Sequence, residues 1–96
     1  MNKQIIVETI KQKLSQFQEV NRVIIFGSFM SSEHPNDVDI AIEQNSNDNY
    51  LFLSLKYRKV LRDLSKLIPL DIVPIKKGTD GVFLEEIFKG KVVYER

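Results

Sequence analysis

The sequence predicts an α+β fold in which a small mixed β-sheet is covered on one face by helices. Short runs rich in β-branched residues, typical of strands, alternate with longer segments whose apolar residues recur at helical spacing. The predicted order is helix, strand, short helix, strand, long helix, strand, short helix, strand. In a chain of 96 residues, this order favours a single domain over residues 1–96, with one sheet at its centre.

The first third of the chain contains a predicted helix and a predicted strand. Residues 3–18 carry apolar side chains at helical spacing, and residues 20–26 are rich in β-branched residues and end at Gly27. Residues 28–36 contain Ser, Pro and Asn and are predicted to form one short helical turn followed by a loop. The apolar positions of the helix are Ile6, Ile10, Leu14 and Phe17.

The middle of the chain combines a two-faced strand with the strongest helix signal. Residues 37–43 alternate apolar residues with acidic or small ones, as expected for a strand with two different faces. The polar run 44–49 is a predicted loop, and residues 50–67 form a predicted amphipathic helix. Its apolar stripe consists of Leu53, Tyr57, Val60, Leu61, Leu64 and Leu67.

The last third is predicted to contain two strands separated by a short helix. Pro69 follows the long helix, and residues 70–75 have strand character. A glycine-containing turn leads to a predicted helix at 82–88, and a last short strand is predicted at 92–94.

Composition excludes several classes of protein. The 14 basic and 13 acidic residues nearly cancel to a net charge of +1, whereas a dedicated nucleic-acid binder normally has a marked basic excess. There is no cysteine, which excludes disulfides and thiolate metal sites. The charged, amphipathic start does not resemble a signal peptide, and no stretch is long enough to span a bilayer. We therefore expect a cytoplasmic protein without direct contact to membrane or nucleic acid.

Three aspartates form the main candidate site. Asp37 and Asp39 are two residues apart on a predicted strand, so their side chains project from the same face. Leu70 and Ile72 place Asp71 on the opposite, polar face of the next strand, where it joins the pair if the two strands are neighbours. Carboxylates so close repel one another unless a cation lies between them. The trio therefore predicts a two-metal site for phosphoryl transfer, with two Mg²⁺ ions.

The Gly27-Ser28 step adds a candidate phosphate site directly after the first strand. Glycine lets the backbone approach a ligand closely, and the start of a helical turn offers free N–H groups to a phosphate. The simpler interpretation, a strand-ending turn with Ser28 as a helix cap, is compatible with phosphate binding because a capped helix start is also an anion site.

Taken together, Gly27-Ser28, Asp37-Val38-Asp39 and Asp71 resemble the signature of the nucleotidyltransferase superfamily. In size and layout the chain is most similar to the minimal nucleotidyltransferases, over essentially its whole length, and residues 87–95 also resemble the end of that branch. The resemblance implies a nucleotidyltransferase fold with a helix-strand-helix-strand-helix-strand core.

The same resemblance implies roles for the residues. Asp37, Asp39 and Asp71 are then the metal ligands and catalytic residues, with Asp71 helping to activate the acceptor hydroxyl. Gly27 and Ser28 hold the phosphates of ATP, the nucleotide donor. Members of this branch are commonly antitoxins paired with a small helical HEPN-type toxin, and some transfer AMP from ATP to a tyrosine hydroxyl of that toxin.

Three functions stay open at this point. The leading one is transfer of a nucleoside monophosphate to a protein hydroxyl, with the acceptor site supplied by a partner or by a second copy of the chain. The loop at 29–36 is short for the family and has Met30, Ser31 and Ser32 where many members carry an arginine, which motivates the second: a binding module that neutralises its partner by contact. The third is a stand-alone enzyme acting on a small hydroxylated molecule, which requires a deep pocket beside the carboxylates.

The remaining polar residues have plainer interpretations. His34 is expected to be an exposed loop residue. The stripe of Arg58, Arg62 and Lys66 is expected to be a solvated helix face, with a partner-docking or nucleotide-facing surface as the alternative. Lys76 and Lys77 are expected to be ordinary turn charges, with a phosphate contact as the alternative.

Overall fold

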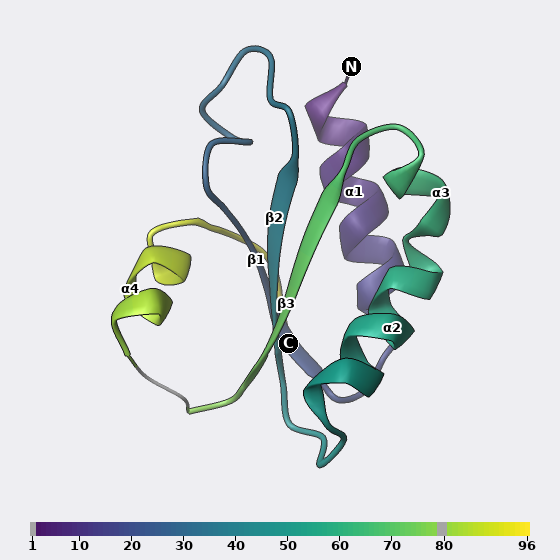
Figure 1. The fold of residues 1–96 in the computed structure, drawn as a ribbon, viewed down its shortest axis with the longest axis vertical. Coiled ribbons are helices and arrows are strands. Elements are labelled where there is room, and N and C mark those ends of the chain that lie inside the picture. Colours follow the sequence, from purple (N-terminus) through teal and green to yellow (C-terminus); the bar gives the residue numbers. More distant parts are fainter. Residues whose placement is uncertain (1, 79–80) are drawn as a thin grey trace.

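A computed structural model describes residues 2–78 and 81–96 and confirms the α+β class. Four helices and four strands follow one another along the described chain (Figure 1). No helix in these described ranges is long and apolar enough to cross a membrane. The elements are α1 (Lys3–Leu14), β1 (Val20–Phe26), β2 (Val38–Gln44), α2 (Tyr50–Val60), α3 (Arg62–Ser65), β3 (Leu70–Lys76), α4 (Val82–Phe88) and β4 (Lys91–Glu95).

The four strands form one mixed sheet in the order β3-β2-β1-β4. Strand β1 pairs antiparallel with both β2 and β4, whereas β2 and β3 are parallel. A parallel pair needs a long crossover connection, and here α2 and α3 provide it. The sequence left open whether the strands at 37–43 and 70–75 are neighbours; the structure pairs them as β2 and β3, and β3 is an edge strand.

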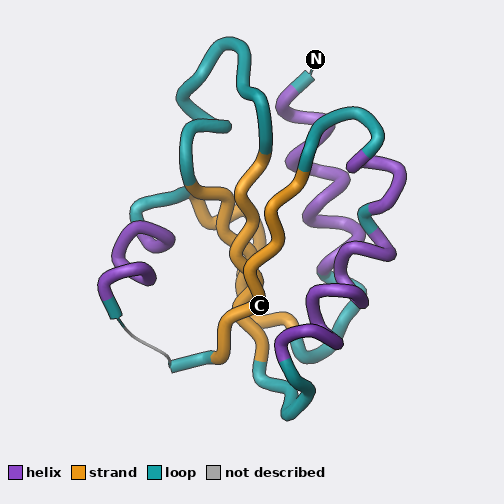
Figure 2. Tube along the Cα trace, viewed as in Figure 1, coloured by secondary structure: helices purple, strands orange, loops and turns teal. Residues whose placement is uncertain are grey.

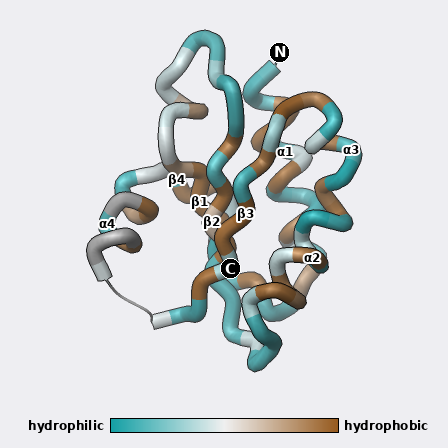
Figure 3. The backbone as a smooth tube through the Cα atoms, in the orientation of Figure 1, coloured by the Kyte–Doolittle hydropathy of each residue, from teal (hydrophilic) through white to brown (hydrophobic). Residues whose placement is uncertain are grey.

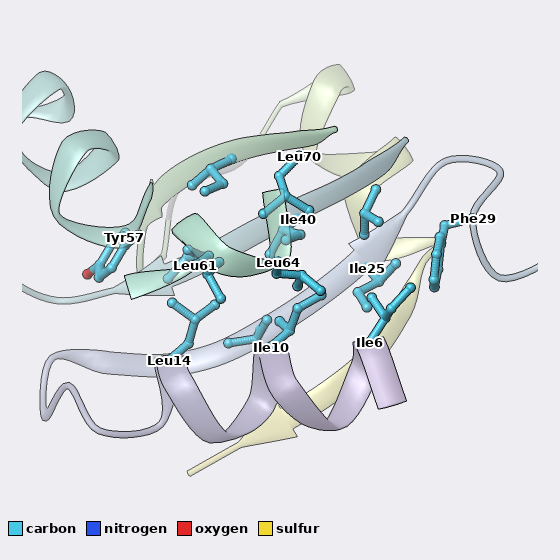
Figure 4. Close-up of a cluster of buried hydrophobic side chains, with 14 of the residues drawn as sticks. Ile6, Ile10, Leu14, Ile25, Phe29, Ile40, Tyr57, Leu61, Leu64 and Leu70 are labelled. Carbon is cyan, nitrogen blue, oxygen red and sulfur yellow. The ribbon is translucent and has the colours of Figure 1, made fainter. Parts of the chain in front are cut away.

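Helices α1, α2 and α3 cover one face of the sheet with a continuous apolar core (Figures 1 and 2). The inward residues of α1 lie on the strand residues that face them, and Leu61, Leu64 and Tyr57 close the other side of this core (Figure 4). Phe29, from the loop after β1, fills the end of the same cluster. This face accounts for most of the buried apolar residues of the described chain.

Helix α4 lies on the opposite face of the sheet, whereas the sequence predicted helices on one face (Figure 1). Its Leu84 and Ile87 pack on Ile24 and Ala41, the strand residues that point away from the main core. The strands carry apolar side chains on both faces there, and burial of the second set requires a helix on that side. The remainder of this second face is left uncovered by α4.

The predicted helix at 50–67 is divided in two. The backbone leaves helical geometry at Leu61, with φ −102° and ψ 14°, between α2 and α3. No proline or glycine occurs at this point. After the break Ile68 enters the core, while Leu67, predicted to lie on the apolar stripe, is 74% exposed.

The other boundaries agree closely with the pattern in the sequence. Strand β1 and helix α4 have the predicted limits, and the ends of the other strands differ from the prediction by at most one residue. Helix α1 ends at Leu14 instead of residue 18, although Phe17 still packs on the ring of Tyr57 at 5.3 Å. Hydropathy follows the same plan, with apolar strands at the centre and a mostly hydrophilic loop between β1 and β2 (Figure 3).

Candidate metal and nucleotide site

The three predicted aspartates come together at one end of the sheet. Asp39 on β2 is the register partner of Asp71 on the parallel strand β3, and Asp37 lies just before β2. One carboxylate oxygen of each lies within 4.8 Å of the others. Asp37 and Asp39 are half-buried and Asp71 is exposed, so the cluster opens to solvent. Sequence alternation could place each side chain on a face, and the parallel pairing aligns them.

The cluster is electrostatically unfavourable as it stands. Burial raises the pKa of the Asp39 carboxyl above its usual range, and the negative charge of Asp37 raises it further. A side-chain hydrogen bond and the charge of Asp71 act in the same direction on the pKa of Asp39. Each contribution disfavours the ionised form, which a bound cation would favour.

The donor set fits a hard divalent cation. All three side chains offer carboxylate oxygens, the ligands that Mg²⁺ prefers. The three oxygens lie within 4.8 Å of one another, so the carboxylates would have to draw closer together to share one bound cation.

Gly27 is held against the carboxylates by its backbone conformation. Its φ is +73°, a left-handed value that side chains other than hydrogen rarely allow. A Cβ atom at this position would lie 2.3 Å from Oδ2 of Asp39. The chain can therefore pass beside the carboxylates only with glycine here, which brings the Gly27-Ser28 step to the metal site.

The segment after Gly27 forms the predicted single helical turn. The backbone N–H groups of Ser31 and Ser32 both donate to the carbonyl of Ser28, at 3.2 and 2.8 Å. Phe29 anchors the turn because its ring is almost fully buried in the main core. Ser28 itself is exposed, and its hydroxyl makes no hydrogen bond to another described residue, so it does not act as the cap.

Lys3 is a contributor to this segment that the sequence does not reveal. Its ammonium group reaches from the start of α1 and donates to the backbone carbonyls of Met30 and Ser32. The same nitrogen lies 5.7 Å from the ring centroid of Phe29. A lysine in this distant helix thus supports the turn. No spacing rule connects residues so far apart in sequence.

The plainer expectations for His34 and Lys76 agree with the structure. His34 is exposed in the loop before β2, where its N–H donates to Oγ of Ser32. Lys76 reaches the loop before α2, with its Nζ 3.2 Å from the carbonyl oxygen of Ser46. It lies at the opposite end of β3 from Asp71, about 16 Å along the strand at about 3.3 Å per residue. Lys76 is therefore a loop contact and not a phosphate ligand of this site.

Comparison with known proteins identifies the family by sequence. The family model described as "Polymerase beta, Nucleotidyltransferase" matches residues 8–96. No curated protein matches the chain significantly.

Solved structures share the fold at low sequence identity. One chain in the structure of a tri-AMPylated Shewanella oneidensis HEPN toxin in complex with MNT antitoxin superposes with a TM-score of 0.75 and 18% identity, over 99% of this chain and 74% of that chain. A chain of a toxin–antitoxin structure with AMP-PNP gives a TM-score of 0.70 and 18% identity, over 94% and 73% of the two chains. A third, from a substituted MntA-HpeT toxin–antitoxin pair, gives 0.60 and 15%, over 100% and 74%.

Proposed function

This chain belongs to the polymerase beta nucleotidyltransferase family, and we propose that it transfers a nucleoside monophosphate, AMP from ATP, to a hydroxyl group of a partner protein. The observation that carries the proposal is the cluster of Asp37, Asp39 and Asp71 within 4.8 Å, with the turn at Gly27 against it. Carboxylates on one side and an exposed turn on the other match the two needs of phosphoryl transfer, metal ligands and a place for phosphates.

The three aspartates would hold Mg²⁺, one or two ions, which supply positive charge to the phosphate oxygens when bound. Gly27 and Ser28 hold the β- and γ-phosphates of the nucleotide at the turn. Asp71, the most exposed of the three carboxylates, accepts the proton of the acceptor hydroxyl. The hydroxyl oxygen bonds to the α-phosphorus, the bond from that phosphorus to the bridging oxygen breaks, and pyrophosphate leaves.

The acceptor is a protein, because the site is open on the surface of this small chain. Gly27, Ser28 and Asp71 are all exposed, whereas an enzyme acting on a small molecule needs a pocket that surrounds it. Structures with the same fold contain an AMPylated HEPN toxin with MNT antitoxin, and a toxin–antitoxin pair with AMP-PNP. We infer a helical HEPN-type protein as the partner and a toxin–antitoxin pair as the setting.

Labelled ATP tests the transfer. The chain is incubated with Mg²⁺, the protein encoded by the adjacent gene and ATP labelled at the α- or the γ-phosphate. We expect label in the partner from α-labelled ATP only, and none from the Asp37→Ala/Asp39→Ala variant. The matched control is Asp63→Ala, which removes a fully exposed carboxylate elsewhere. The absence of transfer by the wild type, or equal transfer by the double variant, would contradict the enzymatic proposal.

The second candidate is neutralisation of the partner by contact alone. The short loop at 29–36 and its lack of an arginine favour this function, because a charge-assisted contact to the phosphates is missing. Neutralisation in cells separates the two candidates. If the Asp37→Asn variant protects cells from the partner as well as the wild type does, contact alone is sufficient; loss of protection with normal folding supports catalysis.

A further inference from the structure

A groove lies on the outer side of the molecule, between helices α2 and α3 and the edge strand β3. Its volume is about 260 Å³, and its floor is formed by Leu70 and Ile72 of β3. Its wall combines the apolar side chain of Leu55 with polar ones. The full lining is Leu55, Arg58, Lys59, Arg62, Ser65, Leu70 and Ile72.

The groove carries a concentrated positive charge. Arg58, Lys59 and Arg62 line it, and no carboxylate of the described chain lies within ion-pair distance of any of them. The nearest acidic residue in sequence, Asp63, does not line the groove and pairs with Lys66 at 3.7 Å. The guanidinium of Arg58 is held in place by a 3.4 Å hydrogen bond to the carbonyl of Leu70. Uncompensated arginines are well suited to bind carboxylates in a bidentate manner.

An exposed apolar stripe leads into this groove. Leu51 and Leu55 are one helical turn apart on α2 and therefore share a face, and they are 67% and 59% exposed. Exposed leucines next to unpaired arginines are typical of protein interfaces, in which apolar contacts dominate the centre and arginine is enriched. A nucleic acid would use the charge but would leave the leucines without a partner.

The groove is also adjacent to the catalytic edge of the sheet. Leu70 and Ile72 form its floor, and Asp71 lies between them in sequence with its side chain on the other face. A protein seated in the groove therefore contacts the same edge strand that carries a catalytic carboxylate. The partner residues that flank the segment in the groove can reach Asp71 by passing around the exposed edge of β3.

We propose that this groove, together with the exposed Leu51 beside it, is the docking surface for the acceptor protein, which presents an apolar segment flanked by carboxylates. The inference rests on the proposed function and assigns the surface by which the partner is held. Charge complementarity sets the orientation and association rate, and the leucines supply apolar burial. The acceptor hydroxyl is then delivered around the β3 edge.

The test measures by calorimetry the affinity of this chain for its proposed partner, taken as the product of the adjacent gene. Arg58→Glu/Arg62→Glu is expected to weaken binding at least tenfold and to reduce its salt dependence. The matched control, Lys11→Glu/Lys13→Glu at two exposed lysines of α1, makes the same charge change and is expected to stay within twofold. Arg62→Glu alone keeps the Arg58 hydrogen bond and serves if the double variant does not fold. Leu51→Ser/Leu55→Ser should also weaken binding, whereas Ile5→Ser on another exposed apolar position should not.

The outcomes separate the groove from the proposed reaction. If the groove variants bind with an affinity within twofold of the wild type, the docking proposal is wrong, but the transfer of label by the wild type is unaffected. A wild-type chain that forms no complex contradicts both the groove and the proposed partner. A fluorescein-labelled single-stranded RNA serves as the competing ligand. If it binds more tightly than the protein and loses affinity in Arg58→Glu/Arg62→Glu, the groove is a nucleic-acid site and the proposal is wrong.

Discussion

Neighbouring residues of one strand have different environments, because they point to opposite faces of the sheet. On β2, Ile40 is fully buried beneath the three helices, while Asp39, the residue before it, points to the face that α4 covers only in part. The helix-covered face contains most of the core. The other face keeps three carboxylates within 4.8 Å of one another, at a cost in charge repulsion. A residue that stabilises the core and a residue of the candidate site are thus consecutive on the same strand.

The largest effect on stability is expected on the face covered by α1, α2 and α3. Ile40→Ala leaves a cavity in the main core and should lower the free energy of unfolding by about 3 kcal/mol. Urea unfolding followed by circular dichroism measures this loss. Ala41→Gly, at the next position but on the α4 face, is the comparison; a loss as large as that of Ile40→Ala would contradict the difference between the faces.

On the other face, the expected effect is on activity. Asp39→Asn should lower transfer of label from ATP at least about 100-fold, because a metal ligand supplies several kcal/mol of charge stabilisation. The fold should be retained, since a neutral side chain removes the repulsion from Asp37 and Asp71. Rate measurements on folded variant protein check this; a variant that keeps a tenth or more of the wild-type rate would exclude Asp39 as a metal ligand.

The pH dependence of stability should have opposite signs on the two sides. Burial opposes the ionised form of Glu19, but hydrogen bonds from Lys56, its own backbone and Tyr57 outweigh it, so the pKa of Glu19 is lowered. Its contribution to stability is therefore full above the ordinary carboxyl pKa and is lost as pH falls through the lowered pKa. The raised pKa of Asp39 works the other way, since stability decreases as pH rises through the window between its ordinary and raised pKa.

Urea unfolding of Glu19→Gln and Asp39→Asn across about pH 3 to 8 tests this contrast without added metal. Relative to the wild type, Glu19→Gln should lose about 1 kcal/mol near neutral pH and little in acid. Asp39→Asn should gain stability near neutral pH and little in acid. Differences that do not vary with pH, or that have the same sign in both variants, would contradict the electrostatic account.

The smallest effect is expected at the support of the turn. Lys3→Met removes the ammonium group that holds the carbonyls of Met30 and Ser32, and it should weaken nucleotide binding a few-fold, within about 1 kcal/mol. Fluorescence titration with labelled ATP measures the change. Lys13→Met, an exposed lysine at the far end of the same helix, should leave the affinity unchanged; equal losses in the two variants would exclude a specific role for Lys3.

Much of this contrast could be predicted from the sequence, because alternation along a strand directly encodes its two faces. The opposite directions of Asp71 and its neighbours Leu70 and Ile72 are an example. The proximity of Asp71 to Asp39 needed the pairing of two strands, which alternation alone does not determine.

Other features depend on tertiary contacts that leave no local signal. The break at Leu61 occurs without proline or glycine, and the placement of α4 follows from the apolar second face of the inner strands. The contact of Lys3 with the turn joins segments from separate elements, and no periodicity links them. The groove beside β3 likewise appears only when the helices are packed against the edge strand.

The most direct measurement of the central claim is the melting temperature of the wild type and of Asp39→Asn, with and without Mg²⁺, near neutral pH. Without Mg²⁺ the variant should melt at the higher temperature, because the repulsion between the carboxylates is relieved. With Mg²⁺ the wild type should gain and the variant should not, since a ligand that binds only the folded site stabilises it. The contrary result is a wild type that melts no lower than the variant without Mg²⁺ and whose melting temperature does not change with the ion. It would contradict the claim that the carboxylates destabilise the metal-free fold and bind a metal.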